Sequence, residues 1–149
     1  MRTTRICVKS SLINNVAFEM HNNRKELGRA TWHALHYASL NGLNVLEGLY
    51  LIHDKYPCKT CRKHFQEKFS RQSLEKIVQS IGPVQGVIFI HNIVNISLKK
   101  TTYYYTYKTL TDTFTKPYYQ PVGMTSEIRS AIKGFIQKLN KRCSIPLEI

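Results

Sequence analysis

Residues 83–99, with the sequence PVQGVIFIHNIVNISLK, decide whether this chain contains a β-sheet. Eight of the twelve residues from Val87 to Leu98 are apolar, and most of these are β-branched, which favours a strand. The segment continues for about 15 residues after Pro83, however, and that length favours a buried helix. Residues 101–109 contain four tyrosines and also have the composition of a strand. Propensity alone therefore supports an all-α and an α+β fold equally.

The segments around residues 83–99 have the periodicity of amphipathic helices, with apolar residues three and four positions apart. Asn41-Gly42 separates the first two segments, because this pair is typical of a helix end followed by a turn. Pro57 opens the third, because proline is tolerated in a first helical turn. Residues 71–82 are expected to form a polar connection, in which Leu74 to Val78 could form one helical turn. The expected helices cover residues 27–40, 43–56, 58–70 and a last amphipathic segment capped by Ser126.

Length and composition narrow the class of protein. The chain has 149 residues, which fits one domain, and its 42% of hydrophobic residues excludes a disordered tail. The longest apolar run, Val87 to Ile90, is far short of the roughly 18 residues that cross a membrane, and no secretory signal is recognisable. Four cysteines are too few for a secreted disulfide scaffold. A soluble intracellular protein is expected.

The chain is strongly basic, since 22 Lys and Arg against 9 Asp and Glu give a net charge of +13. These basic residues are scattered, and no run of five or more exists. A generally solvated basic surface and a surface for polyanions such as nucleic acid therefore both remain open.

The six-residue stretch YPCKTC, residues 56–61, is the sharpest chemical feature of the chain. Cys58 and Cys61 at a helix start can close a small ring. The helix N-terminus and nearby basic residues would stabilise a thiolate, the form that attacks disulfides. A C-x-x-C motif alone supports redox chemistry, metal binding or neither. His64 completes a C-x2-C-x2-H pattern, so a zinc site is a competitor, although no second motif supplies the fourth ligand.

Two further groups of polar side chains occur where apolar ones would be ordinary. One group shares a face of the first expected helix and comprises Arg29, Trp32 and His36. The other would be buried if residues 83–99 were helical, and comprises His91, Asn92 and Asn95. Buried polar groups need partners. A bound polar ligand and ordinary hydrogen bonding to neighbouring side chains stay open for both groups.

Taken in series, these motifs resemble the Erv/ALR family of FAD-dependent sulfhydryl oxidases. They read GRxxWxxLH at residues 28–36, YPCxxC at 56–61 and HNxVNxxLxK at 91–100. Their order and the 30-residue step from Cys61 to His91 are similar to the family pattern, and the resemblance covers residues 27–108. The short step of 26 residues from Trp32 to Cys58 makes the chain most similar to the compact members encoded by large DNA viruses.

The resemblance implies an all-α fold, in which a four-helix bundle binds FAD and is followed by a short fifth helix. Residues 83–99 would then be helical, with tertiary context overriding propensity. The periodicity adds a C-terminal amphipathic helix. The implied division is an N-terminal arm at residues 1–24, an Erv/ALR-like domain at 25–110 and a C-terminal extension at 111–149. Family members usually form homodimers, so a homodimer is expected.

The resemblance also implies roles for individual residues. Cys58 and Cys61 would be the catalytic pair, with Cys58 the more exposed sulfur that receives electrons and Cys61 the sulfur against the flavin. No metal site is implied. Cys7 and Cys143 belong to no second C-x-x-C motif, so both are expected to be unpaired surface or packing thiols. The alternative is that one of them, across a dimer, carries electrons from the substrate to the inner pair. The residues implied to line the cofactor are Gly28, Arg29, Trp32, His36, Tyr56, Cys61, His91, Asn92, Val94, Asn95, Lys100 and Tyr104.

The implied activity is a thiol oxidase that forms disulfide bonds in proteins. Electrons would pass from dithiols through Cys58 and Cys61 to FAD and then to O2, giving H2O2. The expected partners are protein dithiols and O2, in the host cytoplasm and in the virion of a virus, without a membrane and without nucleic acid. One alternative is a zinc-stabilised basic nucleic-acid-binding protein that uses Cys58, Cys61 and His64. Another is an inactive relative that keeps the fold and binds FAD.

Overall fold

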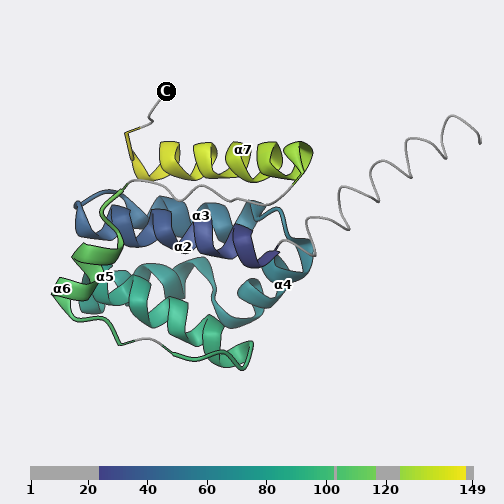
Figure 1. The fold of residues 1–149 in the computed structure, drawn as a ribbon. Coiled ribbons are helices and arrows are strands. Elements are labelled where there is room, and N and C mark those ends of the chain that lie inside the picture. The colour runs from purple at the N-terminus through teal and green to yellow at the C-terminus, as the bar shows by residue number, and fades with distance from the viewer. Residues whose placement is uncertain (1–23, 103, 117–124, 147–149) are drawn as a thin grey trace, which may run out of the picture.

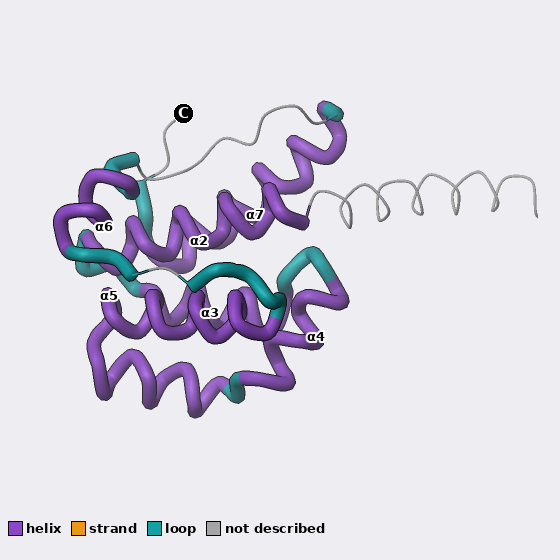
Figure 2. Tube along the Cα trace, turned by 60° about the horizontal axis from the view of Figure 1, so that its bottom comes forward, coloured by secondary structure: helices purple, strands orange, loops and turns teal. Residues whose placement is uncertain are grey.

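A computed structural model of the chain describes residues 24–102, 104–116 and 125–146 (Figure 1). Its helices are α2 (Arg24–Leu40), α3 (Val45–Lys55), α4 (Lys59–Lys68), α5 (Arg71–Ser97), α6 (Tyr107–Thr113) and α7 (Ser126–Cys143). Within these described residues there are helices and loops but no strand (Figure 2). The all-α expectation is therefore confirmed, and the α+β alternative is wrong because residues 83–97 are helical.

The helices are arranged in layers around one core (Figure 1). α2 and α3 lie side by side in the middle, α7 covers one side of this pair and α5 the other, and α4 packs against α3. Burying one leucine or isoleucine stabilises such a core by roughly 1.5–3 kcal/mol. Side chains from four helices are fully buried here, among them Leu27, Leu35, Leu49, Ile90, Ile132 and Leu139.

Local sequence signals set the boundary between α2 and α3. α2 ends before Asn41-Gly42, where Gly42 has a φ of 67°, a left-handed conformation that suits glycine. α3 then begins after Asn44, whose side chain accepts a hydrogen bond from the Glu47 amide. The first two predicted helices and the break between them are therefore confirmed.

Residues 71–82 differ from the expectation, because they are helical as far as a bend at Gly82. Its apolar residues do have helical spacing, at Leu74, Ile77, Val78 and Ile81, so the sequence carried a signal that the expectation missed. Ser70 caps the segment, and Leu74 is fully buried. At the bend, Gly82 has a φ of 86°, which glycine tolerates far better than other residues. Pro83 explains the bend, since it has no N–H to donate and disfavours a helical conformation at the preceding residue.

Two smaller expectations also need correction. The described part of residues 101–109 contains no strand; instead Thr106 caps the short helix α6. The N-cap of α7 is Thr125 rather than Ser126, and its side chain accepts a hydrogen bond from the Ile128 amide. Threonine and serine offer the same capping chemistry, so sequence alone does not choose between neighbouring hydroxyls.

α7 approaches α3 so closely that one position between them has room only for glycine. A Cβ added to Gly48 would collide with the Cys143 sulfur and lie 3.0 Å from Leu35 Cδ2 and 3.2 Å from Leu139 Cδ1. Because α7 completes the core over α2 and α3, it is an integral part of the folded unit. Its buried apolar side chains are Ile128, Ile132, Phe135, Ile136, Leu139 and Cys143.

α5 is the one described helix that is long and apolar enough to cross a membrane by length and composition. Its outer face exposes apolar side chains such as Phe89 and Ile96. It also bends at Gly82, and Val87 and Ile90 are fully buried where it packs against α2 and α3. α5 therefore contacts the core along one narrow face, since only 17% of its membrane-length window is buried.

Candidate active site

Cys58 and Cys61 form a disulfide at the start of α4. Their Cα atoms are 5.2 Å apart, within the usual range for a bridged pair. Cys58 is also the N-cap of α4, and its sulfur accepts a hydrogen bond of 3.2 Å from the Cys61 amide. The positive end of a helix stabilises a thiolate released from such a disulfide. The pair is therefore placed for thiol–disulfide exchange.

The two sulfurs are exposed in the opposite order to the one expected. Cys58 is only 6% exposed and belongs to the core, whereas Cys61 is half-buried. The cap supplies the physical reason, because the Cys58 side chain turns back over the first turn of α4 to reach the Cys61 amide. Cys61 is thus the more exposed residue of the pair.

Tyr56 fixes the turn in front of the disulfide. Its buried hydroxyl lies 3.2 Å from Oγ1 of Thr31 on α2, and its ring meets Phe135 of α7 edge-on at 5.3 Å. Arg62 donates a hydrogen bond of 3.0 Å to the Tyr56 carbonyl. Burial raises the pKa of Tyr56 to about 12, so the hydroxyl stays protonated. Tyr56 therefore ties the disulfide turn to both α2 and α7.

A cluster of aromatic rings joins α2 to α5. Trp32 stacks on His91, with ring centroids 4.2 Å apart and 8° between the ring planes. His36 is fully buried, and its Nε2 lies 3.0 Å from Nδ1 of His91. We call Trp32, His36 and His91 the histidine cluster. Two of the three sequence motifs therefore meet in space at this cluster.

Residues that the sequence analysis did not single out cover the histidine cluster. Phe114, which follows α6, stacks on His36 with centroids 4.5 Å apart, and Tyr105 meets the same imidazole edge-on at 5.5 Å. His33 contacts the Phe114 ring, and its Nε2 lies 2.8 Å from the Lys116 carbonyl oxygen. The tyrosine-rich stretch was a signal for Tyr105, whereas Phe114 has no comparable signal in the sequence.

Two polar side chains in and next to the histidine cluster have buried atoms without a hydrogen-bond partner among the described residues. Nδ1 of His36 and Nδ2 of Asn95 are buried and have no hydrogen-bond partner in the described part of the chain. Burial, together with the neighbouring His91 and His33, lowers the pKa of His36 to about 3. Burial and the charge of Lys100 lower the pKa of His91 to about 4. Both imidazoles are therefore neutral at neutral pH.

Three of the other residues that were expected to line the cofactor are more exposed than the histidine cluster. Arg29 is exposed and pairs with Glu26 at 2.6 Å. Lys100 is exposed just beyond α5. Tyr104 is fully exposed, whereas the neighbouring Tyr105 contacts His36, because adjacent residues in an extended chain point to opposite sides. Gly28 on α2 is half-buried, and so are Asn92 and Val94 on α5.

The sequence of this chain matches a known protein family. The sequence model of the Erv1 / Alr family matches residues 29–116, which is more than half of the chain. The chain belongs to the Erv1 / Alr family. No curated protein and no solved structure matches it. Erv1 / Alr proteins are known for thiol oxidase activity and are generally flavin-dependent, and the Cys58–Cys61 disulfide fits a sulfhydryl oxidase.

The disulfide also bears on the zinc-binding alternative for this Erv1 / Alr protein. Cys58 and Cys61 are bonded to each other, so neither sulfur is a metal ligand in this state. His64 is exposed on α4. Among the described residues, no group of three His, Cys, Asp or Glu side chains is placed to hold a metal ion. The pairing of the sulfurs favours redox chemistry at this motif.

Cys143 is a free, fully buried cysteine at the end of α7. Burial raises its pKa to about 12, so it remains a thiol. Its contact with Gly48 makes it a packing residue of the α3–α7 interface, which fits the expectation for this cysteine. Cys7 lies outside the described residues.

Acid is expected to destabilise this Erv1 / Alr protein through the histidine cluster. The pKa values of His36 and His91 are lowered from 6.5, so below pH 6.5 the unfolded chain binds protons that the folded chain does not. The stability they contribute is complete above that pH and is lost as the pH falls toward 4. From about pH 7 to about pH 5 we expect each imidazole to account for a loss of about 2 kcal/mol.

Urea unfolding at both pH values measures this loss. His91→Phe keeps a flat ring against Trp32 but cannot titrate, so it should remove about half of the effect. His64→Gln changes an exposed histidine and should leave the loss unchanged. An acid loss of the same size in His91→Phe and in the wild type would contradict the assignment to the cluster.

Proposed function

We propose that this chain is an FAD-linked thiol oxidase that introduces disulfide bonds into other proteins. The observation that carries the proposal is the Cys58–Cys61 disulfide at a helix start, inside the family match. Such a disulfide oxidises a substrate dithiol to a disulfide and is itself reduced to two thiols. Bound FAD supplies the electron transfer from the reduced pair to O2, which gives H2O2.

The described residues fit an FAD site at the histidine cluster. In this proposal α2 to α5 correspond to the four-helix bundle of the family, and α6 to its short fifth helix. The stacked rings of Trp32 and His91 offer flat surfaces to a planar cofactor, and Lys100 adds positive charge for its phosphates. Nδ1 of His36 and Nδ2 of Asn95 are buried polar atoms that a bound cofactor would satisfy.

α2 connects the proposed cofactor site to the disulfide. Its Thr31 contacts Tyr56, two residues before Cys58, and its His36 contacts His91. Five residues of helix separate these two contacts, a rise of about 7.5 Å. Five residues also turn the helix by about 140°, so the two contacts lie on different faces of α2, and the body of this helix links the redox pair to the histidine cluster.

The steps performed by the chain itself are thiol–disulfide exchanges. A substrate thiolate attacks one sulfur of the Cys58–Cys61 bond, forms a mixed disulfide and releases the other sulfur as a thiolate. A second substrate thiol then attacks the mixed disulfide, so that the substrate leaves oxidised and both enzyme sulfurs are reduced. The N-terminus of α4 stabilises the thiolate that is released.

The roles of the two sulfurs follow from the resemblance to the family. It assigns Cys58 to the substrate and Cys61 to the flavin. The half-buried position of Cys61 supports the second assignment, since it leaves a surface for a planar ring. Cys58 is buried, so attack on it requires the turn at Pro57 to open.

The proposal is tested by purification and turnover. A purified protein that is yellow, with absorption near about 450 nm, and that oxidises dithiothreitol with release of H2O2 supports an oxidase. Stoichiometric zinc without flavin would support the zinc-binding alternative. Bound FAD without turnover of dithiothreitol would identify an inactive relative.

His91 is expected to hold the cofactor as well as to support the fold. His91→Ala removes the ring stacked on Trp32 and a polar contact to His36, so FAD retention should weaken by about 1–3 kcal/mol. Gel filtration followed by the ratio of flavin to protein absorbance measures retention. His64→Ala is the matched control, since it makes the same change at an exposed histidine on α4 and should leave retention unchanged. If His91→Ala keeps all of its flavin and only its melting temperature falls, the role of His91 is structural only.

Assembly, location and the extent of the domain complete the proposal. The resemblance to the family supports a homodimer, an Erv/ALR-like domain over residues 25–110 and no requirement for nucleic acid. The resemblance to compact viral members supports a viral protein that oxidises protein dithiols in the host cytoplasm and in the virion. Light scattering of the purified flavoprotein tests the homodimer.

A further inference from the structure

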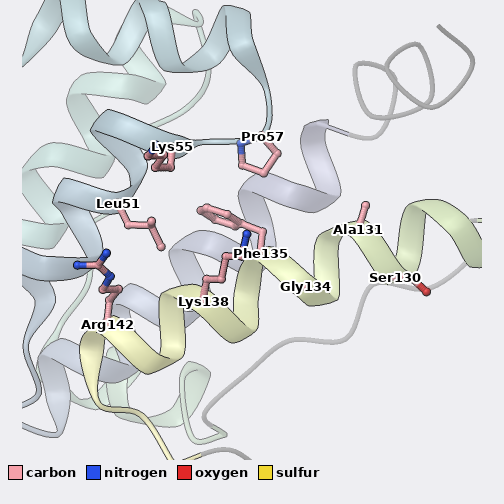
Figure 3. A pocket seen from close by; sticks show the side chains of 9 residues that line it. All are labelled: Leu51, Lys55, Pro57, Ser130, Ala131, Gly134, Phe135, Lys138 and Arg142. Atoms are coloured by element: carbon pink, nitrogen blue, oxygen red, sulfur yellow. The ribbon is translucent and has the colours of Figure 1, made fainter. Parts of the chain in front are cut away.

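A groove of about 540 Å³ lies between α3 and α7, beside the turn that leads to the disulfide (Figure 3). The groove is partly open to solvent, so it suits a segment of another protein better than an enclosed small molecule. The groove is separate from the histidine cluster, which lies between α2 and α5. Its lining residues are Leu51, Lys55, Pro57, Ser130, Ala131, Gly134, Phe135, Lys138 and Arg142.

The charge around this groove has a single sign. Lys55, Lys138 and Arg142 line it, and no lining residue is acidic. Arg142 is paired with Glu47, which lies outside the lining, at 3.4 Å. Lys55 and Lys138 are exposed, and neither forms an ion pair with any described residue. The groove therefore presents two uncompensated positive charges.

The wall between these charges is apolar. Figure 3 shows the Phe135 ring in the middle of the groove, with Lys55 and Pro57 on one side and Lys138 on the other. Leu51 and Phe135 are held in place by packing and are 8% and 5% exposed, so each presents a small apolar area to the groove. An occupant with acidic side chains and at least one apolar side chain would complement both the charge and the surface of this groove.

The groove is also connected to the redox site. Pro57 at its edge is bonded to Cys58, and Phe135 contacts Tyr56 on the other side of Pro57. A segment bound here would bring a neighbouring cysteine of the same molecule to the turn that carries the disulfide. Six of the nine lining residues belong to α7, outside the family match of residues 29–116.

We propose that this groove docks an acidic, partly apolar segment of the protein dithiols that the enzyme oxidises. This inference rests on the proposed function, which it deepens by naming a property of the substrate. Docking raises the local concentration of the substrate cysteines at Cys58 and Cys61, so it lowers the KM for acidic substrates without changing the chemistry of the pair.

Direct binding is tested with a peptide that cannot undergo redox chemistry. The probe is a fluorescein-labelled decapeptide that contains Glu and Leu but no Cys, and anisotropy measures its affinity for the full-length protein. Lys55→Glu/Lys138→Glu should weaken binding by about tenfold or more. Arg129→Glu/Lys133→Glu is the matched control. It makes the same change in net charge on an exposed part of α7 that does not line the groove, and should shift affinity by less than about twofold.

A second variant tests the groove by its shape. A Cβ added to Gly134 meets no atom within 4 Å, so Gly134→Leu can fill the groove from α7 without a clash at its first carbon. Gly134→Leu should block the peptide while keeping all charges, whereas Gly134→Ala should bind it almost normally. Unchanged binding in both Lys55→Glu/Lys138→Glu and Gly134→Leu would overturn the proposal. The protein could instead fail to bind the peptide but bind a single-stranded oligonucleotide through Lys55 and Lys138. That result would make the groove a nucleic-acid site and would also overturn the proposal.

Turnover separates failure of the groove from failure of the proposed function. The substrates are two peptide dithiols that differ only in flanking Glu or Gln, together with dithiothreitol. Lys55→Glu/Lys138→Glu should raise the KM for the Glu-flanked peptide by about tenfold and leave kcat and the other two substrates unchanged. Equal KM values for both peptides in the wild type would overturn the docking proposal alone. No turnover of any dithiol by the wild type would overturn the proposed function, while the anisotropy measurement would still test the groove.

Discussion

Replacing Cys61 with serine is expected to abolish oxidation of dithiols, with a loss of about three orders of magnitude or more. The reason is that the Cys58–Cys61 bond is the electron acceptor, and serine cannot form it. Cys58→Ser should be equally inactive, but its Cys61 thiolate should still give a long-wavelength charge-transfer band with bound FAD. Oxygen consumption with dithiothreitol measures the first effect, and absorption spectra of the purified variants measure the second.

Cys143→Ser is the matched control for both substitutions. Cys143 is buried and unpaired, so its replacement should leave turnover nearly unchanged and affect only packing against Gly48. A charge-transfer band in Cys61→Ser and none in Cys58→Ser would exchange the roles of the two sulfurs, in line with their order of exposure. Retained oxidase activity in both variants would show that this pair is not the redox centre.

Leu139→Ala is expected to destabilise the protein by about 2–5 kcal/mol, although it lies outside the family match. Leu139 is fully buried, and α7 packs against both α2 and α3. Removing the Leu139 side chain would leave a cavity beside Gly48. The neighbouring side chains are closely packed and do not move far enough to fill it. Urea unfolding followed by circular dichroism measures the change.

Gln137→Ala is the matched control on the same helix. Gln137 is exposed, so its truncation should change the free energy of unfolding by less than about 0.5 kcal/mol. A Leu139→Ala protein as stable as Gln137→Ala would contradict the position of α7 on the core. A large loss confined to Leu139→Ala would show that the C-terminal helix is needed for the fold of the family-matched part.

The placement of Tyr104 shows why part of the candidate site could not be predicted. The resemblance to the family implies a cofactor contact for this tyrosine, but its side chain is fully exposed and Tyr105 faces His36. The choice between adjacent residues depends on how the chain leaves α5 and enters α6, and Thr106 caps that short helix. Phe114 was missed for a similar reason, since its contact with His36 joins residues far apart in the sequence.

The sequence by itself determined the features that depend on near neighbours along the chain. Helical periodicity and the Asn41-Gly42 break gave α2 and α3, and Pro57 gave the start of α4, because capping and backbone conformation are set within a few residues. The order of the three motifs gave the family, which the match over residues 29–116 shows.

Only the tertiary structure decided which side chains meet across helices and which are covered. It buried Cys58 beneath the first turn of α4, left Cys61 half-buried, and made α7 a wall of the basic groove at Lys55 and Lys138. These features follow from the distances and rotations between α2, α3, α5 and α7. Close packing among non-local side chains such as Gly48 sets those quantities, and no short stretch of sequence encodes them.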